Sequence, residues 1–419
     1  MGKDNLMSTV SQKLDDLIHH IAYEEIVGDK PASESSELLE KLTSLGSELW
    51  IDTGDLEKAQ SIWKSELAAL TTNNTLANQV VQSGVMDETI RDTVKKLRAV
   101  GANLNEEELV TEIGFVINCK IALRLVQAFK VKVSVELHPS MSRDIEKTLI
   151  YARRYYKICP ANFIIKIPLT PEGFLAVRTL RREGMPINFT LGFSARQNYL
   201  AARLSNPSYV NVFLGRLNQV VIDNGLGNGE MVGEKVTLAT QGALWDLRTD
   251  DPDVTTRLIG ASIRNGNQVA ALAGVDVLTI PPGAMEDFLK TCGSKELKSH
   301  VSDDITPGID SGNSSAGKFD ALWDVSDSFK GFVDSLLNQE GVDSMTGDAL
   351  RAFCDEHKID LFHPFSAEQF NTITEHGKIP RLQEWPDTIA LDDLMTQSAL
   401  QSFAKDQKAL DERIQSFIQ

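Results

Sequence analysis

The stretch FIIKIPLTPEGFLAVRTLRREGMPINFTL, residues 163–191, decides the fold prediction. It opens with a short apolar run, continues with a longer segment whose apolar residues recur at helical spacing, and ends in a second short apolar run. A strand, a helix and a second strand in this order form a βαβ unit, which places both strands parallel in one sheet. A lysine, Lys166, stands inside the first apolar run.

The same alternation extends along the chain in both directions. Short apolar runs are separated by segments with helical periodicity. Eight such runs fit a closed (β/α)8 TIM barrel better than an open sheet. The predicted strands are residues 49–52, 68–72, 131–136, 163–167, 187–191, 209–213, 257–261 and 276–280.

Helical patterns flank the predicted barrel on both sides. One pattern near the N-terminus is LDDLIHHIAYEEIV (14–27), and a long amphipathic pattern covers 391–417. We therefore expect an α/β protein with N-terminal and C-terminal helical extensions. The predicted organisation is an N-terminal helical extension (1–48), a catalytic barrel (49–290), a loop and helical elaboration (291–386) and a C-terminal helix that packs on the barrel (387–419).

Charge and composition narrow the classes of partner. The formal net charge is -17, which disfavours nucleic acid and anionic membranes as partners. No apolar run reaches the length of a membrane span, and the N-terminus lacks the apolar core of a signal peptide. The four cysteines have no CxxC spacing, which fits reduced thiols. We expect a cytoplasmic protein without a metal or cofactor. The helical extensions could cover the barrel or bind a second subunit, so a homo-oligomer is one of the possible assemblies.

Lys166 is out of place in an apolar strand unless it is paired or functional. Burial disfavours the charged ammonium form, and an imine-forming lysine must react as the neutral amine. The alternative is a structural ion pair with Glu136 or Asp52. Taken alone, Lys166 fits the ion pair better than the nucleophile.

A series of motifs favours the nucleophile over the ion pair as the role of Lys166. The chain resembles the transaldolase family over about residues 49–285, and its last helical segment, 391–414, is similar to the family's C-terminal helix. The resemblance implies a TIM barrel and imine chemistry at Lys166 on sugar phosphates. The motifs, in the family's order, are IDTGD (51–55), TTNNT (71–75), VSVEL (133–137), IIKIPLTPEG (164–173), INFTLGFS (187–194), VFLGR (212–216) and GASIRN (260–265).

The resemblance also implies roles for the catalytic residues. Lys166 would form an imine with the ketose carbonyl. Asp52 would take the hydroxyl proton as the aldehyde product leaves. Glu136 would move protons through a bound water that Thr190 orients.

Substrate contacts are implied in the same way. Asn73 and Asn188 would bind substrate hydroxyls, and Arg216 and Arg264, together with Ser262, would hold the phosphate, whose geometry suits guanidinium groups. Asn211 stands where the family usually has a serine that contacts the donor, which puts the preferred sugars in doubt.

Two positions bear on the reaction type. The related fructose-6-phosphate aldolases tend to carry Gln and Tyr where this chain has Glu136 and Phe213. The chain is therefore predicted to be a transaldolase of the pentose phosphate pathway type, which transfers a dihydroxyacetone unit from a ketose phosphate to an aldose phosphate. A class I aldolase that releases the free ketone, and a non-catalytic sugar-phosphate-binding protein, are the alternatives.

Overall fold

A closed barrel of eight parallel strands forms the centre of the computed structural model, which describes residues 2–99, 104–292, 297–310 and 316–418. Neighbouring strands pair in chain order, and the last strand pairs with the first. The TIM-barrel prediction is confirmed, and each strand lies within one or two residues of its predicted range. The strands are β1 (Glu48–Asp52), β2 (Leu67–Thr71), β3 (Lys132–Glu136), β4 (Phe163–Pro168), β5 (Ile187–Thr190), β6 (Tyr209–Phe213), β7 (Arg257–Ala261) and β8 (Val277–Ile280).

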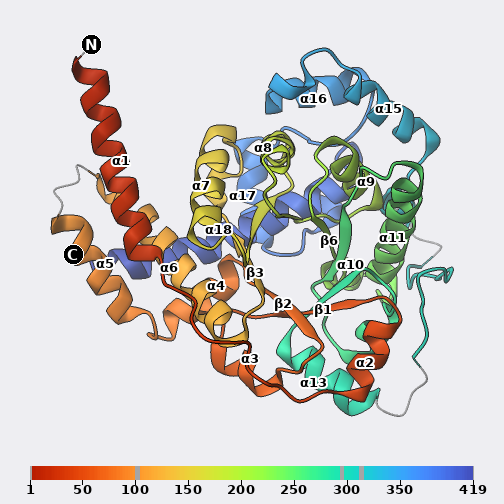
Figure 1. Ribbon diagram of the computed structural model, residues 1–419. Helices are drawn as coiled ribbons and strands as arrows, with labels where there is room; N and C mark the ends of the chain where they lie inside the picture. The colour runs from red at the N-terminus through yellow and green to blue at the C-terminus, as the bar shows by residue number, and fades with distance from the viewer. Residues whose placement is uncertain (1, 100–103, 293–296, 311–315, 419) are drawn as a thin grey trace.

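Helices surround the barrel (Figure 1). Side-chain caps start several of them: Asp55 caps α3, a capping box of Asn105 and Glu108 starts α6, and Thr170 caps α8. The helices up to the end of the barrel are α1 (Gly2–Ala22), α2 (Glu37–Ser44), α3 (Leu56–Ile62), α4 (Asn74–Gln82), α5 (Asp87–Ala99), α6 (Glu106–Phe129), α7 (Ile145–Ile158), α8 (Pro171–Arg182), α9 (Ala195–Leu204), α10 (Leu214–Asp223), α11 (Val232–Asp250), α12 (Gly266–Ala271) and α13 (Pro282–Thr291), with the 3-10 turn η1 (Pro139–Met141) before α7.

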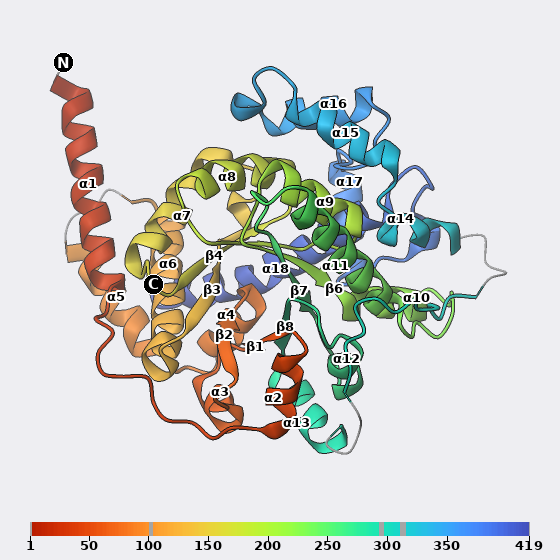
Figure 2. The ribbon, with the colours of Figure 1, turned by 45° about the vertical axis from the view of Figure 1, so that its right-hand side comes forward.

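The N-terminal segment is less helical than its sequence pattern predicts. Helix α1 packs against α6 and α7, and its N-terminal end projects beyond the body of the molecule in both ribbon views (Figures 1 and 2). It stops at Ala22, although the helical pattern continues to Val27. Beyond it the chain runs along α6, where the side chain of Gln127 accepts from the Val27 N–H and donates to its carbonyl, each at 3.0 Å. This tertiary contact replaces the helical hydrogen bonds of the segment.

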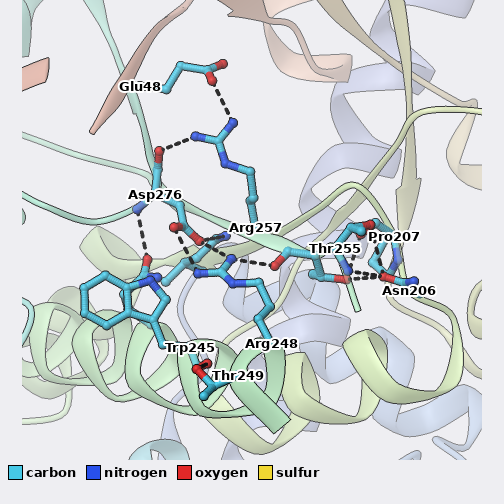
Figure 3. Close-up of polar contacts among 12 residues, drawn as sticks. Glu48, Asn206, Pro207, Trp245, Arg248, Thr249, Thr255, Arg257 and Asp276 are labelled. Atoms are coloured by element: carbon cyan, nitrogen blue, oxygen red, sulfur yellow. Dashed lines mark hydrogen bonds and ion pairs between the residues drawn. The ribbon is translucent and has the colours of Figure 1, made fainter. Parts of the chain in front are cut away.

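The amino ends of the strands are tied together by ion pairs. Arg257 at the start of β7 pairs with Glu48 at the start of β1 at 2.7 Å. Arg248 in α11 pairs with Asp276, just before β8, at 2.8 Å (Figure 3). The same Asp276 carboxylate accepts from the Leu258 N–H at 3.0 Å. These contacts link strands and a covering helix at the end of the barrel opposite the cavity described below, where residues serve stability.

The C-terminal elaboration packs on one side of the barrel (Figure 2). Helix α14 contacts α9 and α11, α15 contacts α9, α16 contacts α8, and α17 contacts α18. The last helix, α18, crosses the barrel in both ribbon views and packs against α4 and α6. The elements are η2 (Ala316–Phe319), α14 (Asp320–Trp323), α15 (Asp327–Leu337), η3 (Val342–Ser344), α16 (Gly347–Glu356), α17 (Ala367–His376), η4 (Leu382–Glu384) and α18 (Leu391–Gln415).

Two adjacent buried carboxylates anchor the first turn of α18. Asp392 accepts two hydrogen bonds from Arg196 of α9, each at 2.9 Å, and one from Ser194 at 2.7 Å. Burial opposes ionisation of Asp392, but the charge and hydrogen bonds of Arg196 outweigh it and lower its pKa. Asp393 has the backbone N–H of His363 as a donor at 2.6 Å. Burial, reinforced by the Asp392 carboxylate, raises the pKa of Asp393 to about 8.

The raised pKa of Asp393 predicts a loss of stability with rising pH. An unfolded aspartate titrates near pH 3.9, so between that pH and about 8 the folded chain binds the extra proton and its stability falls as the pH rises. We expect the unfolding free energy to fall by about 2 kcal/mol between about pH 6 and pH 8 through this group. Asp393→Asn keeps an acceptor for the His363 N–H and should remove this slope.

Thermal melts across the pH range check this expectation. Asp387→Asn is the control, because its carboxylate pairs with Lys318 at the surface and is 88% exposed. Its melting curve should follow that of the unsubstituted protein. Parallel pH profiles for the Asp393→Asn variant and the unsubstituted protein would contradict the expectation.

Candidate active site

A cavity of about 290 Å³ opens at the carboxyl ends of the strands, where TIM barrels place their active sites. Most of the sequence-predicted site residues line it. Glu136 and Thr190 lie beside it, each on a strand that neighbours β4, which carries Lys166. The predicted residues in the cavity wall are Asp52, Asn73, Lys166, Asn188, Asn211, Phe213, Arg216, Ser262 and Arg264.

Lys166 lies on β4 and is only 4% exposed. Its register partners are Glu136 on β3 and Asn188 on β5, so the three residues stand at one level of the barrel. Lys166 Nζ is 3.2 Å from Glu136 Oε2 and donates to the carbonyl of Thr72 at 3.2 Å. The ion pair that the sequence left as an alternative is therefore present, and it sits inside the cavity wall.

Glu136 and Thr190 have unused hydrogen-bonding capacity. Burial raises the pKa of Glu136, and the charge of Lys166 only partly opposes this. Among the described residues, Glu136 Oε1 and Thr190 Oγ1 are buried atoms without a hydrogen-bond partner. A buried carboxylate oxygen and a buried hydroxyl in this state are suited to share a bound water.

Asp52 ends β1 on the cavity wall. Burial raises its pKa, while the charge of Lys166 and a 2.5 Å hydrogen bond from Thr71 act in the opposite direction. Thr71 is also 2.6 Å from the hydroxyl of Thr279. Asp55, not Asp52, caps α3. Asp52 therefore has no structural role as a helix cap.

Amide side chains occupy the adjacent wall. Asn211 donates to Asn188 Oδ1 at 2.9 Å, and Asn188 donates to the Ser134 hydroxyl at 3.0 Å. These bonds fix both side chains in orientation. Asn73 caps α4 by accepting from the Leu76 N–H at 2.9 Å, so its oxygen has a structural role that the sequence did not predict.

The cavity wall also carries two arginines, Arg216 and Arg264, that have no counterion among the described residues. Arg216 is 6% exposed in the first turn of α10, and its Nη1 has no hydrogen-bond partner among the described residues. Within the described ranges, no carboxylate lies within 4.0 Å of Arg216 or Arg264 as an ion-pair partner. Burial, and then the charge of Arg264, lowers the pKa of Arg216 to about 10. Burial also lowers the pKa of Arg264.

The backbone around these arginines is closely packed. Ser262 has a φ of 63°, and it follows β7 directly. A Cβ on Gly215 would lie 2.2 Å from the Ser262 carbonyl oxygen and 2.8 Å from Arg264 Nε. Glycine therefore allows the start of α10 to approach the Ser262–Arg264 loop. Two guanidinium groups, a hydroxyl and a helix N-terminus together form a site suited to a phosphate.

Sequence reasoning missed several lining residues. The ring of Phe403 in α18 lies 5.5 Å from the Arg216 guanidinium carbon and 6.0 Å from Lys166 Nζ. Lys378 also lines the cavity from the loop after α17. Similarity of the final segment to the family's C-terminal helix was the only signal for Phe403, and no signal in the sequence indicated Lys378. The other lining residues not predicted are Thr71, Thr75, Leu76, Gln79, Ile259, Ala261, Thr279 and Pro281.

The described residues contain neither a metal-binding cluster nor a membrane-spanning helix. No group of three or more His, Cys, Asp or Glu side chains in the described ranges could hold a metal ion. No helix in the same ranges has the length and apolar character needed to cross a membrane.

Comparison with known proteins agrees with this geometry. Residues 49–325 match the family described as Transaldolase/Fructose-6-phosphate aldolase. The chain belongs to this family. A probable transaldolase from Thermus thermophilus is 32% identical over 247 residues, which cover 58% of this chain and 91% of that protein. A probable transaldolase from Caldicellulosiruptor saccharolyticus is 40% identical over 131 residues, which cover 31% of this chain and 54% of that protein.

Membership of the transaldolase/fructose-6-phosphate aldolase family supports an aldolase-type enzyme that acts on sugar phosphates. The matched range contains the whole barrel and ends at residue 325. Helices α15 to α18, which include Phe403, lie outside it.

Proposed function

We propose that the chain is a transaldolase that moves a dihydroxyacetone unit from a ketose phosphate to an aldose phosphate through an imine on Lys166. The observation that carries the proposal is a buried lysine that pairs with Glu136 and lines one cavity with Asp52, both carboxyl groups having a raised pKa, together with two arginines that have no ion-pair partner among the described residues. Reactions of this type belong to pentose phosphate metabolism, for which we propose a cytoplasmic setting.

The first step joins the enzyme to the donor. The neutral amine of Lys166 attacks the ketose carbonyl carbon, and the resulting carbinolamine loses water to give the imine. Glu136, with a water held between it and Thr190, would carry protons to and from the carbinolamine oxygen. The raised pKa of Glu136 favours this role, because the carboxyl group holds a proton more readily than an exposed glutamate does.

The second step breaks the carbon–carbon bond. Asp52 takes the proton of the hydroxyl group on the carbon that becomes the aldehyde. As the carbon–carbon bond breaks and the aldehyde leaves, the bonding electrons move into the protonated imine and form an enamine. The enamine then attacks the carbonyl carbon of the acceptor aldehyde, and Asp52 returns the proton. Water hydrolyses the new imine and releases the product. Asn73, Asn188 and Asn211 would hold the sugar hydroxyls.

Transfer, as opposed to simple cleavage, is supported by Phe213. Its ring is 8% exposed on the cavity wall and lies 5.8 Å from the ring of Phe193. An apolar ring offers no hydroxyl group that could direct a water at the enamine. The enamine would therefore wait for an acceptor aldehyde.

An acceptor-dependence experiment tests this proposal against the class I aldolase alternative. The full chain is given fructose 6-phosphate alone, and then together with erythrose 4-phosphate. We expect release of glyceraldehyde 3-phosphate to depend on the acceptor, with free dihydroxyacetone formed at least about a hundredfold more slowly. Equal rates with and without the acceptor would establish the aldolase instead.

A further inference from the structure

Lys378 is a cation at the mouth of the active-site cavity that comes from outside the family match. It lies in the loop between α17 and η4, is exposed, and lines the cavity together with Arg216 and Arg264. The match to the family ends at residue 325, so this side chain belongs to the C-terminal segment beyond the match, residues 326–419, called here the added segment.

The fold holds the loop that carries Lys378 in place. Helix α17 ends at Gly377, whose φ of 74° turns the chain away from the helix. Just beyond Lys378, Asn224 donates to the Pro380 carbonyl at 3.0 Å and accepts from the Leu382 N–H at 2.7 Å. Asn224 is the C-cap residue that directly follows α10.

Helix α10 thus connects the loop to the proposed phosphate site. Its first turn carries Arg216, and its last residue is followed by Asn224, which binds the loop. The loop and the buried arginine are consequently fixed to one rigid element. Lys378 reaches the cavity from a defined position and not as part of a free tail.

The charge of Lys378 is available to a ligand. Among the described residues, no carboxylate lies within 4.0 Å of it as an ion-pair partner. Lys318 of the same C-terminal region, by contrast, pairs with Asp387 at 2.6 Å. A lysine ammonium is a hydrated point charge on a flexible stem, and at the rim of a site it attracts an anion before the guanidinium groups deeper in the site bind it.

We propose that Lys378 is the third cation of the phosphate site, which contacts the phosphate of the bound sugar at the cavity mouth and favours phosphorylated over unphosphorylated sugars. This inference rests on the proposed transaldolase function. Arg216, which is buried, and Arg264, which is exposed, would fix the phosphate, and Lys378 would capture it from solution.

Steady-state kinetics of Lys378→Met test the inference. We expect the KM for fructose 6-phosphate to rise about three- to tenfold with kcat unchanged within about twofold, because an exposed charge adds binding and capture but no chemistry. The effect should shrink in about 0.3 M KCl, where screening weakens the contact. The rate of turnover of unphosphorylated fructose, measured at high enzyme concentration, should be the same in Lys378→Met and in the unsubstituted protein. Lys378→Arg should restore most of the lost affinity.

Lys358→Met is the matched control, because Lys358 is an exposed lysine of the same added segment and does not line the cavity. It should behave like the unsubstituted protein. An unchanged KM for fructose 6-phosphate in Lys378→Met, or an equal loss with fructose, would overturn the role of Lys378.

Failure of the inference and failure of the proposed function can be told apart. If the unsubstituted chain shows no turnover, the transaldolase proposal fails. Calorimetric titration with fructose 6-phosphate then still tests Lys378: weaker binding by the Lys378→Met variant than by the unsubstituted chain supports the contact. Equal binding by both, or no binding by the unsubstituted chain, overturns it.

Discussion

Replacement of Lys166 by methionine is expected to reduce kcat for transfer by about ten-thousandfold or more, because methionine has no amine to form the imine. Methionine has a similar length and fills the same space on β4. The substitution leaves Glu136 without its cationic partner, which should raise the pKa of Glu136 further so that the carboxyl group becomes neutral and remains buried. We therefore expect a folded but inactive protein.

Covalent trapping shows whether Lys166 is the residue that reacts. After reduction with borohydride in the presence of fructose 6-phosphate, mass spectrometry should find a sugar adduct on Lys166 and none in the Lys166→Met variant. Lys157→Met, which removes an exposed lysine of α7, should keep both adduct and activity. If the unsubstituted protein gave no adduct on Lys166, the non-catalytic sugar-phosphate-binding alternative would be favoured.

Replacement of Arg216 by methionine is expected to separate function from stability. Loss of one buried, bidentate phosphate contact should lower kcat/KM for fructose 6-phosphate by about a hundredfold or more, since hydrogen bonds to charged groups contribute about 1.5–3 kcal/mol each. The unfolding free energy should stay constant or rise. Burial lowers the pKa of Arg216 to about 10, so the folded protein disfavours its charge, and methionine removes that cost.

Arg203→Met provides the opposite result as a control. Arg203 pairs with Asp251 at 3.0 Å and with Asp334 at 2.8 Å, and it does not line the cavity. Its loss should lower the melting temperature slightly and leave kcat/KM unchanged. Chemical unfolding and kinetics on both variants decide the matter. A clear loss of stability in Arg216→Met would show that Arg216 holds the barrel together, against its assignment to phosphate binding.

Much of the candidate site could be predicted because barrel geometry converts chain order into spatial proximity. Residues at the carboxyl ends of parallel strands converge on one opening, so Asp52, Lys166 and Arg264 meet there although they are far apart in the chain. The hydrogen-bonding state of these residues could not be predicted. Arg216 has no counterion among the described residues, and this depends on which groups of other elements come within its reach; Asn73 uses its oxygen to cap α4.

The sequence by itself determined the eight strands, their parallel order and the strand-end residues, because hydrophobic periodicity of two kinds and side-chain caps are local properties. Only the tertiary structure decided what covers the cavity. Residues 391–400 of α18 are all buried, the polar ones included, so the polar positions in that half of the helix do not mark a solvent-facing side. Phe403 and Lys378 reach the site through packing of α18 on α4 and of the α17–η4 loop on α10, and such long-range contacts leave no periodic trace in the chain.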